Sequence, residues 1–282
     1  MLPVNIGIRL HDTAPGTLRQ RLGFARAQGF SCAHIALAMT VPGFAMDRAP
    51  ELLTDTLAGD IRAALAENQM DCAVLGCYLN LANPDPEARR RTQEIYKAHL
   101  RFAVKIGAGV VGTETYAHPG TDYDPPAARS EEAFQLFIES LRPVVRAAEE
   151  CGAILAVEPV WHHIISTPAR AQRMLEAVPS DNLQIILDTV NLISPDTATP
   201  EQAQTIIADA VARLGDRVRV LHMKDYQTFP GEVRSMACGT GCLDYRALLA
   251  FAKAKNLPMT LEDTKPDNAE AARLYLERQA AG

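Results

Sequence analysis

Short apolar segments recur along the chain and are separated by longer, more polar stretches. The apolar segments are rich in Val, Ile and Leu, and they do not alternate cleanly between apolar and polar positions. This pattern is typical of strands that are buried on both faces. We therefore predict eight strands, over residues 4–10, 32–37, 72–79, 109–113, 154–158, 183–187, 218–223 and 258–261.

Helix signals follow the predicted strands. Asp85 has the character of an N-cap, with Pro86 at the first helical position and Glu87 in the first turn. Thr199 and Gln202 have the spacing of a capping box. We predict helices over residues 16–29, 50–69, 85–106, 130–152, 167–178, 199–214 and 244–255, and a last helix from residue 267.

Eight strands that alternate with eight helices predict an α/β fold, a single (β/α)8 barrel domain over residues 1–282. No shift in composition and no linker divides the chain. The alternative is a doubly wound open sheet, which a G-x-G-x-x-G fingerprint after the first strand would favour. Leu10-His11-Asp12-Thr13 occupies that place, so we prefer the barrel.

Composition narrows the classes of function. The chain has 282 residues, 48% of them hydrophobic, and a formal net charge of -6, which gives no electrostatic footprint for nucleic acid. No apolar run approaches the ~20 residues that span a bilayer, and the N-terminus lacks the layout of a signal peptide. We therefore expect a cytoplasmic protein that binds neither membranes nor nucleic acid.

The six cysteines are scattered along the sequence, and we expect free thiols in a reducing compartment. Cys238 and Cys242 lie four residues apart in a glycine-rich loop. Because no second Cys or His pair lies nearby, we do not expect them to bind a metal.

Four consecutive strand ends carry residues of the metal-ligand type: Glu158, Asp188, His222 and Glu262. The active sites of such barrels lie at the carboxyl ends of the strands, so the four side chains should ring one pole. Three carboxylates in a dry pocket repel one another, and a divalent cation removes that cost. Three oxygen donors and one imidazole favour Mn2+ first or Mg2+, with Co2+ or Zn2+ as alternatives.

The segments around these residues resemble the xylose-isomerase-like TIM barrels. That group includes the sugar phosphate isomerase and epimerase family, with D-tagatose 3-epimerase, together with inosose dehydratase and endonuclease IV. The resemblance covers the whole chain and rests on Val157-Glu158-Pro159, Leu187-Asp188-Thr189-Val190-Asn191, Leu221-His222-Met223-Lys224-Asp225 and Leu261-Glu262-Asp263. It implies one divalent metal ion held by Glu158, Asp188, His222 and Glu262. It also implies that the two glutamates act as acid and base, and barrels of this type often form dimers or tetramers.

A metal-dependent isomerase or epimerase of a small sugar or keto-polyol is the leading hypothesis. Proton removal next to a carbonyl creates an enediolate, and carboxylates on opposite faces could remove and return the proton. Glu158 and Glu262 are the candidates. A lyase or dehydratase would use the same enolate, and the sequence does not separate the two. A nuclease and a non-catalytic sugar-binding protein are more remote alternatives.

Two positions depart from the pattern of many related epimerases. Asn191 stands where they carry a histidine, and Thr228 stands where they carry an arginine. Lys224 lies two residues after His222 and should point to the same side, where it would contact substrate or form a surface ion pair.

Substrate contacts are expected from several residues, each with a structural alternative. The candidates are Glu114, Trp161, His163, Asn191, Lys224 and Asn80. Asn80 could serve a turn instead, and Trp161 could anchor its loop. Arg9 would pair with an acid or bind an anion, and His118 should be solvated. Gly239 and Gly241 could present N–H groups to an anion, but without a basic cluster we lean towards an unphosphorylated substrate or one with a single acidic group.

Overall fold

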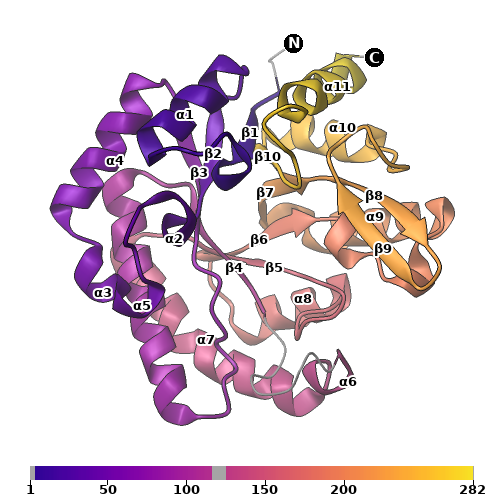
Figure 1. The fold of residues 1–282 in the computed structure, drawn as a ribbon. Coiled ribbons are helices and arrows are strands. Elements are labelled where there is room, and N and C mark those ends of the chain that lie inside the picture. Colours follow the sequence, from indigo (N-terminus) through magenta and orange to yellow (C-terminus); the bar gives the residue numbers. More distant parts are fainter. Residues whose placement is uncertain (1–3, 116–124, 282) are drawn as a thin grey trace.

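The computed structural model describes residues 4–115 and 125–281. Eight parallel strands close into a barrel in the order β1-β10-β7-β6-β5-β4-β3-β2, which confirms the predicted fold class (Figure 1). The barrel strands are β1 (Ile6–Arg9), β2 (Cys32–Ile35), β3 (Asp71–Gly76), β4 (Val110–Glu114), β5 (Leu155–Glu158), β6 (Leu183–Asp188), β7 (Val218–Met223) and β10 (Met259–Leu261).

Helices surround the barrel (Figure 1). The longer ones are α1 (Leu18–Ala27), α4 (Asp55–Glu67), α5 (Pro86–Ile106), α7 (Glu131–Cys151), α8 (Pro168–Ala177), α9 (Pro200–Leu214), α10 (Arg246–Lys255) and α11 (Ala269–Ala281). Short helical turns are α2 (Leu37–Thr40), α3 (Ala49–Leu52), α6 (Pro125–Ala128) and the 3-10 turns η1 (Leu10–Asp12), η2 (Met46–Arg48), η3 (Val190–Leu192), η4 (Pro195–Thr197) and η5 (Gly215–Arg217). Within the described ranges, no helix combines the length and apolar character that a membrane crossing requires.

Local capping explains where several helices begin. Asp85 accepts a hydrogen bond from the backbone N–H of Glu87, as predicted for α5. Thr199 accepts one from the N–H of Gln202, which is half of the predicted capping box at α9. The helix predicted over residues 50–69 is two helices, because Thr54 caps a new start for α4 by accepting from the N–H of Leu57.

A β-hairpin stands where the sequence led us to expect only a glycine-rich loop. Strands β8 (Asp225–Phe229) and β9 (Glu232–Met236) follow β7 and pair antiparallel outside the barrel (Figure 1). Gly231 lies in the turn between them with φ +74°, a conformation that glycine adopts at little cost.

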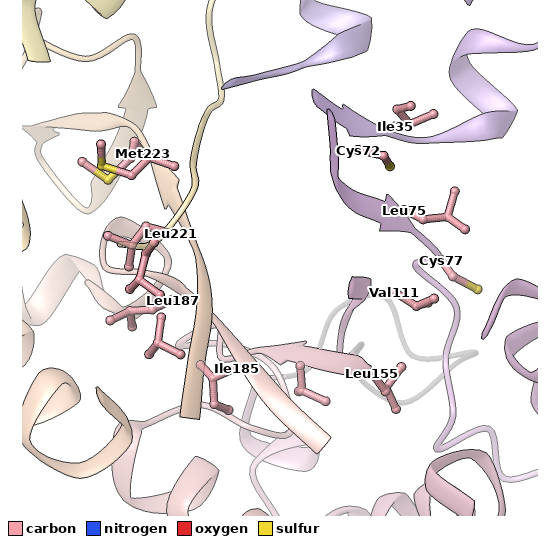
Figure 2. Close-up of a cluster of buried hydrophobic side chains, with 14 of the residues drawn as sticks. Ile35, Cys72, Leu75, Cys77, Val111, Leu155, Ile185, Leu187, Leu221 and Met223 are labelled. Atoms are coloured by element: carbon pink, nitrogen blue, oxygen red, sulfur yellow. The ribbon is translucent and has the colours of Figure 1, made fainter. Parts of the chain in front are cut away.

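Side chains of the barrel strands divide into two sets. One set packs against the surrounding helices in the main core. Figure 2 shows part of this set, including Ile35, Leu187 and Met223. The other is a separate apolar cluster that includes Ala156, Ile186 and Val220. Because strand side chains alternate in direction, Glu158, Asp188 and His222 lie two residues beyond these and point to the same inner side.

Gly112 lies within this inner layer, which is packed too tightly there for a larger residue. A Cβ added at Gly112 would lie 2.6 Å from Val74 Cγ1 and 2.8 Å from Ile186 Cδ1. The inner apolar layer therefore closes the barrel below the polar residues at the strand ends.

Candidate metal centre

Four buried side chains meet at the carboxyl ends of the strands, at the pole expected from the sequence. Asp188 and His222 are register partners on β6 and β7, and Glu262 directly follows β10. His222 Nδ1 lies 2.9 Å from Glu158 Oε2 and 3.3 Å from Glu262 Oε1. The predicted neighbours on consecutive strands are therefore neighbours in space.

The ligand-type atoms form two overlapping groups of three. Glu158, Asp188 and His222 offer atoms that all lie within 4.8 Å of one another, and so do His34, His222 and Glu262. His34 was missed by the sequence reasoning. It lies on β2, its ring stacks on that of His222 at 5.2 Å, and its Nδ1 lies 3.5 Å from Glu262 Oε1.

A signal for His34 was present in the sequence. It is the one imidazole within the apolar segment 32–37, two residues after Cys32, which belongs to the inner barrel cluster. A polar side chain in a strand that is buried on both faces requires a partner.

Lys224 is buried and lies among the carboxylates. Its Nζ is 3.0 Å from Asp188 Oδ2 and 3.3 Å from Glu262 Oε2. Burial alone would lower the pKa of Lys224, but Asp188, Glu262 and their acidic neighbours outweigh burial and raise it well above its usual value. Lys224 is therefore a charged member of the centre, and the alternative of a surface ion pair is wrong.

The carboxylates differ in protonation. Burial, reinforced by the charge of Glu262, raises the pKa of Glu158 to about 8. Burial also raises the pKa of Asp188, to about 6, against the opposing effect of Lys224. For Glu262 burial acts in the same direction, but His222, Lys224, His34 and Arg9 together hold the pKa well below its usual value. Lys224 and Arg9 thus do not balance all of the acidic groups.

The residues fit a divalent cation. The buried Nε2 of His222 has no hydrogen-bond partner among the described residues. Carboxylate oxygens with one imidazole nitrogen are donors that Mg2+, Mn2+ and Zn2+ accept. A cation would also offset the charge of Glu262, which adds to burial in raising the pKa of Glu158.

Hydrogen bonds from the residues that follow β6 orient the carboxylates of Glu158 and Asp188. The Asn191 side-chain amide donates to Glu158 Oε1 at 2.6 Å. The backbone N–H groups of Val190 and Asn191 donate to Asp188 Oδ1 at 2.9 and 3.0 Å. The amide that departs from the epimerase pattern thus orients a predicted ligand.

A cavity of about 360 Å³ opens beside the centre. Among the described residues its lining comprises Arg9, His11, His34, Ala36, Leu37, Ala38, Met39, Met46, Gly76, Tyr78, Glu114 and Glu262. Tyr78 Oη lies 3.1 Å from His34 Nε2, which joins the cavity wall to the centre. The cavity is in the size range of small-molecule sites.

Of the remaining predicted substrate residues, only Glu114 is among the described residues that line the cavity. Glu114 lines the cavity, and burial followed by the charge of Glu158 raises its pKa to about 8. His163 Nδ1 lies 3.7 Å from Glu114 Oε2, but His163 is not among the described residues that line the cavity. Asn80 Oδ1 accepts from the N–H of Ala82, which is the turn role left open above. Trp161 packs edge-on against His162 and is not among the described lining residues.

The structure also bears on the two groups that could have bound an anion, Arg9 and the N–H of Gly239. Arg9 pairs with Asp12, Glu262 and Asp263, so it serves acids of the protein. The N–H of Gly239, which could have bound a substrate anion, instead donates to Asp225 Oδ2 at 3.0 Å.

All six cysteines are free, as predicted, and Cys238 and Cys242 join no candidate metal group in the described ranges. His118 lies outside the described residues.

Residues 23–279 match the model of a protein family described as "Xylose isomerase-like TIM barrel". The chain belongs to this family. The sequence has no significant match among curated proteins.

Solved structures share the fold at low sequence identity. 3-Keto-D-glucoside 4-epimerase, YcjR, from E. coli superposes with a TM-score of 0.76 at 18% identity, covering 98% of this chain and 99% of that one. D-Psicose 3-epimerase in the presence of D-fructose gives 0.75 at 15% identity, covering 99% and 100%. The IOLI protein with a binding zinc atom gives 0.70 at 18% identity, covering 99% and 95%.

Proposed function

We propose that this protein is a divalent-metal-dependent sugar isomerase or epimerase that moves a proton on the carbon next to a carbonyl. The observation that carries the proposal is the meeting of three buried carboxylates and His222 beside a cavity of about 360 Å³. Family membership supports it, as does the shared fold with two sugar epimerases.

Glu158, Asp188, His222 and Glu262 would hold the cation, with Mn2+ as the first choice. When bound, a divalent cation supplies Lewis-acid stabilisation of the negative charge that develops on a carbonyl oxygen. Its identity is a separate question, since relatives with this fold include one described with zinc and one with magnesium.

Glu158 and Glu262 are the proposed acid and base. They approach His222 from β5 and from the end of β10, so they can face a bound sugar from two directions. One removes the proton from the carbon and the other returns it, and return from the opposite face inverts the configuration. Asn191 and Lys224 keep the carboxylates in place.

The preferred substrate is a small sugar or keto-polyol, bound by one barrel domain that spans residues 1–282. We also propose that the protein is cytoplasmic and forms a dimer or tetramer. Light scattering during size-exclusion chromatography would test the oligomeric state.

Proton exchange in heavy water tests the reaction. The Mn2+-loaded protein, mixed with D-fructose or D-psicose, should introduce deuterium next to the carbonyl, as seen by NMR. Glu158→Gln and Glu262→Gln should each slow this exchange by about 10²–10⁴-fold, the usual contribution of a general acid or base. Glu139→Gln, an exposed change on α7, is the control and should exchange like wild type.

Retention of near-normal exchange by both active-site variants would contradict the assignment. Exchange accompanied by loss of water from the sugar would instead identify the dehydratase reaction that shares this enolate chemistry.

A further inference from the structure

The cavity beside the centre has two chemically different sides. One side carries polar groups of the barrel strands, among them His34, Tyr78 and Glu114. The other side is formed by α2 and η2 and contributes Ala36, Ala38, Met39 and Met46. A sugar alone presents hydroxyl groups in most directions, so an apolar wall of this extent is not explained by a bare sugar.

Methionines dominate the apolar side. The Met39 side chain is 60% exposed, the highest value among the large hydrophobic residues of the described chain. Met46 is half-buried on the facing turn. Unbranched, polarizable methionine side chains adapt to apolar groups of varied shape. Exposed apolar surface beside a polar site is typical of ligand-binding surfaces.

The polar side offers little attraction for an anion. Arg9 carries the one positive charge among the described lining residues, and it is shared among Asp12, Glu262 and Asp263. Lys224 is paired with Asp188 and Glu262 and is not among the described residues that line the cavity. Glu114 and Glu262 also line the cavity, and neither side chain offers a positive charge to a phosphate or carboxylate.

We propose that the substrate is a neutral keto-sugar that carries an apolar substituent, such as a glycoside with a hydrocarbon or aromatic aglycone. The sugar lies over His34, Tyr78 and Glu262, and the substituent packs on Met39 and Met46. This inference rests on the proposed sugar chemistry at the same centre and adds the class of substrate to it.

Binding measurements test the inference without turnover. Titration calorimetry on the Mn2+-loaded protein would compare methyl β-D-glucopyranoside, phenyl β-D-glucopyranoside and glucose 6-phosphate as probes. The phenyl glycoside should bind at least about tenfold more tightly than the methyl glycoside, as expected for an apolar group in an apolar subsite. Glucose 6-phosphate should bind no more tightly than the methyl glycoside.

Variants locate the subsite. Met46→Gln and Met39→Gln keep side-chain length but add polarity, and they should remove most of the preference for the phenyl glycoside over the methyl glycoside. Val104→Gln, at a 51% exposed position on α5, is the matched control and should keep the preference.

Equal binding of the phenyl and methyl probes, or a preference that survives both methionine variants, would overturn the inference. So would tighter binding of glucose 6-phosphate. None of these outcomes depends on proton exchange in heavy water, so the proposed reaction stands or fails separately.

Discussion

Lys224 lies in the centre with its ammonium group between Asp188 and Glu262. Removal of one partner from a buried ion pair leaves uncompensated charge in a medium that solvates it poorly. A bound divalent cation could supply part of the missing positive charge. The stability contributed by Lys224 should therefore depend on metal.

Replacement of Lys224 by methionine should lower the free energy of unfolding of the metal-free protein by about 3–5 kcal/mol. Saturating Mn2+ should stabilise this variant more than wild type. A ligand that binds only the folded state stabilises that state, and in the variant the cation also replaces the positive charge that Lys224 supplied. Urea unfolding with and without Mn2+ measures both effects. Lys265→Met, an exposed change, should behave like wild type. A Lys224→Met protein as stable as wild type without metal would refute the role of this charge.

Residues of the centre were predictable to different degrees. Glu158 and Asp188 end apolar strands and His222 is the last residue but one of its strand, so the sequence indicated both their position and their direction. The stacking of His34 on His222 was not predictable, because β2 and β7 are not neighbouring strands and their side chains meet only through closure of the barrel. Likewise, nothing in the sequence separated a buried Lys224 from a surface one.

At the scale of an element, Asp225 holds the segment that follows β7. Its carboxylate accepts hydrogen bonds from the N–H groups of Tyr226, Gly239 and Leu243. The loop therefore folds back on the start of the β8–β9 hairpin. The sequence showed the glycines but not the hairpin, because the pairing of two exposed strands leaves no strong hydrophobic pattern.

Gly241 allows this close packing. An added Cβ would lie 2.2 Å from Tyr226 O and 2.5 Å from Asp225 Oδ1, closer than real contacts permit. Gly241→Ala should therefore lower the free energy of unfolding by about 1–3 kcal/mol, the usual cost of overpacking. Gly59→Ala in α4 has open space and should stabilise the helix by up to about 1 kcal/mol. Thermal unfolding of the two variants, with opposite signs expected, checks the packing; equal effects would count against it.

Helix α5 should make stability depend on pH through His99. This side chain is fully buried, and burial lowers its pKa from 6.5 to about 4. Between these values the unfolded chain binds a proton that the folded chain does not, so stability falls as the pH falls from 6.5 towards 4. The full loss corresponds to roughly 3 kcal/mol.

His99→Gln should flatten the pH dependence of the unfolding free energy across this range, measured by urea unfolding at several pH values. His162→Gln removes a second histidine whose pKa burial lowers to about 4, so it should also flatten the dependence over this range. An unchanged slope in His99→Gln would show that His99 does not control the acid response.

For the whole molecule, regular alternation of apolar strands and capped helices was sufficient to predict the closed barrel. The prediction succeeded because the strands of such a barrel are buried on both faces, and because six of the eight longer helices begin at a Ser, Thr or Asp that caps the first turn. The cavity was not predictable, since it depends on how the short segments α2 and η2 lie over the barrel mouth.

The central claim is that Glu158, Asp188, His222 and Glu262 hold one divalent cation. Anomalous diffraction at the manganese absorption edge, from crystals grown with Mn2+, tests it most directly. We predict one strong peak within roughly 2.0–2.6 Å of donor atoms from these four side chains. A peak at a different place in the molecule, or none at this pole with saturating Mn2+, would contradict the account.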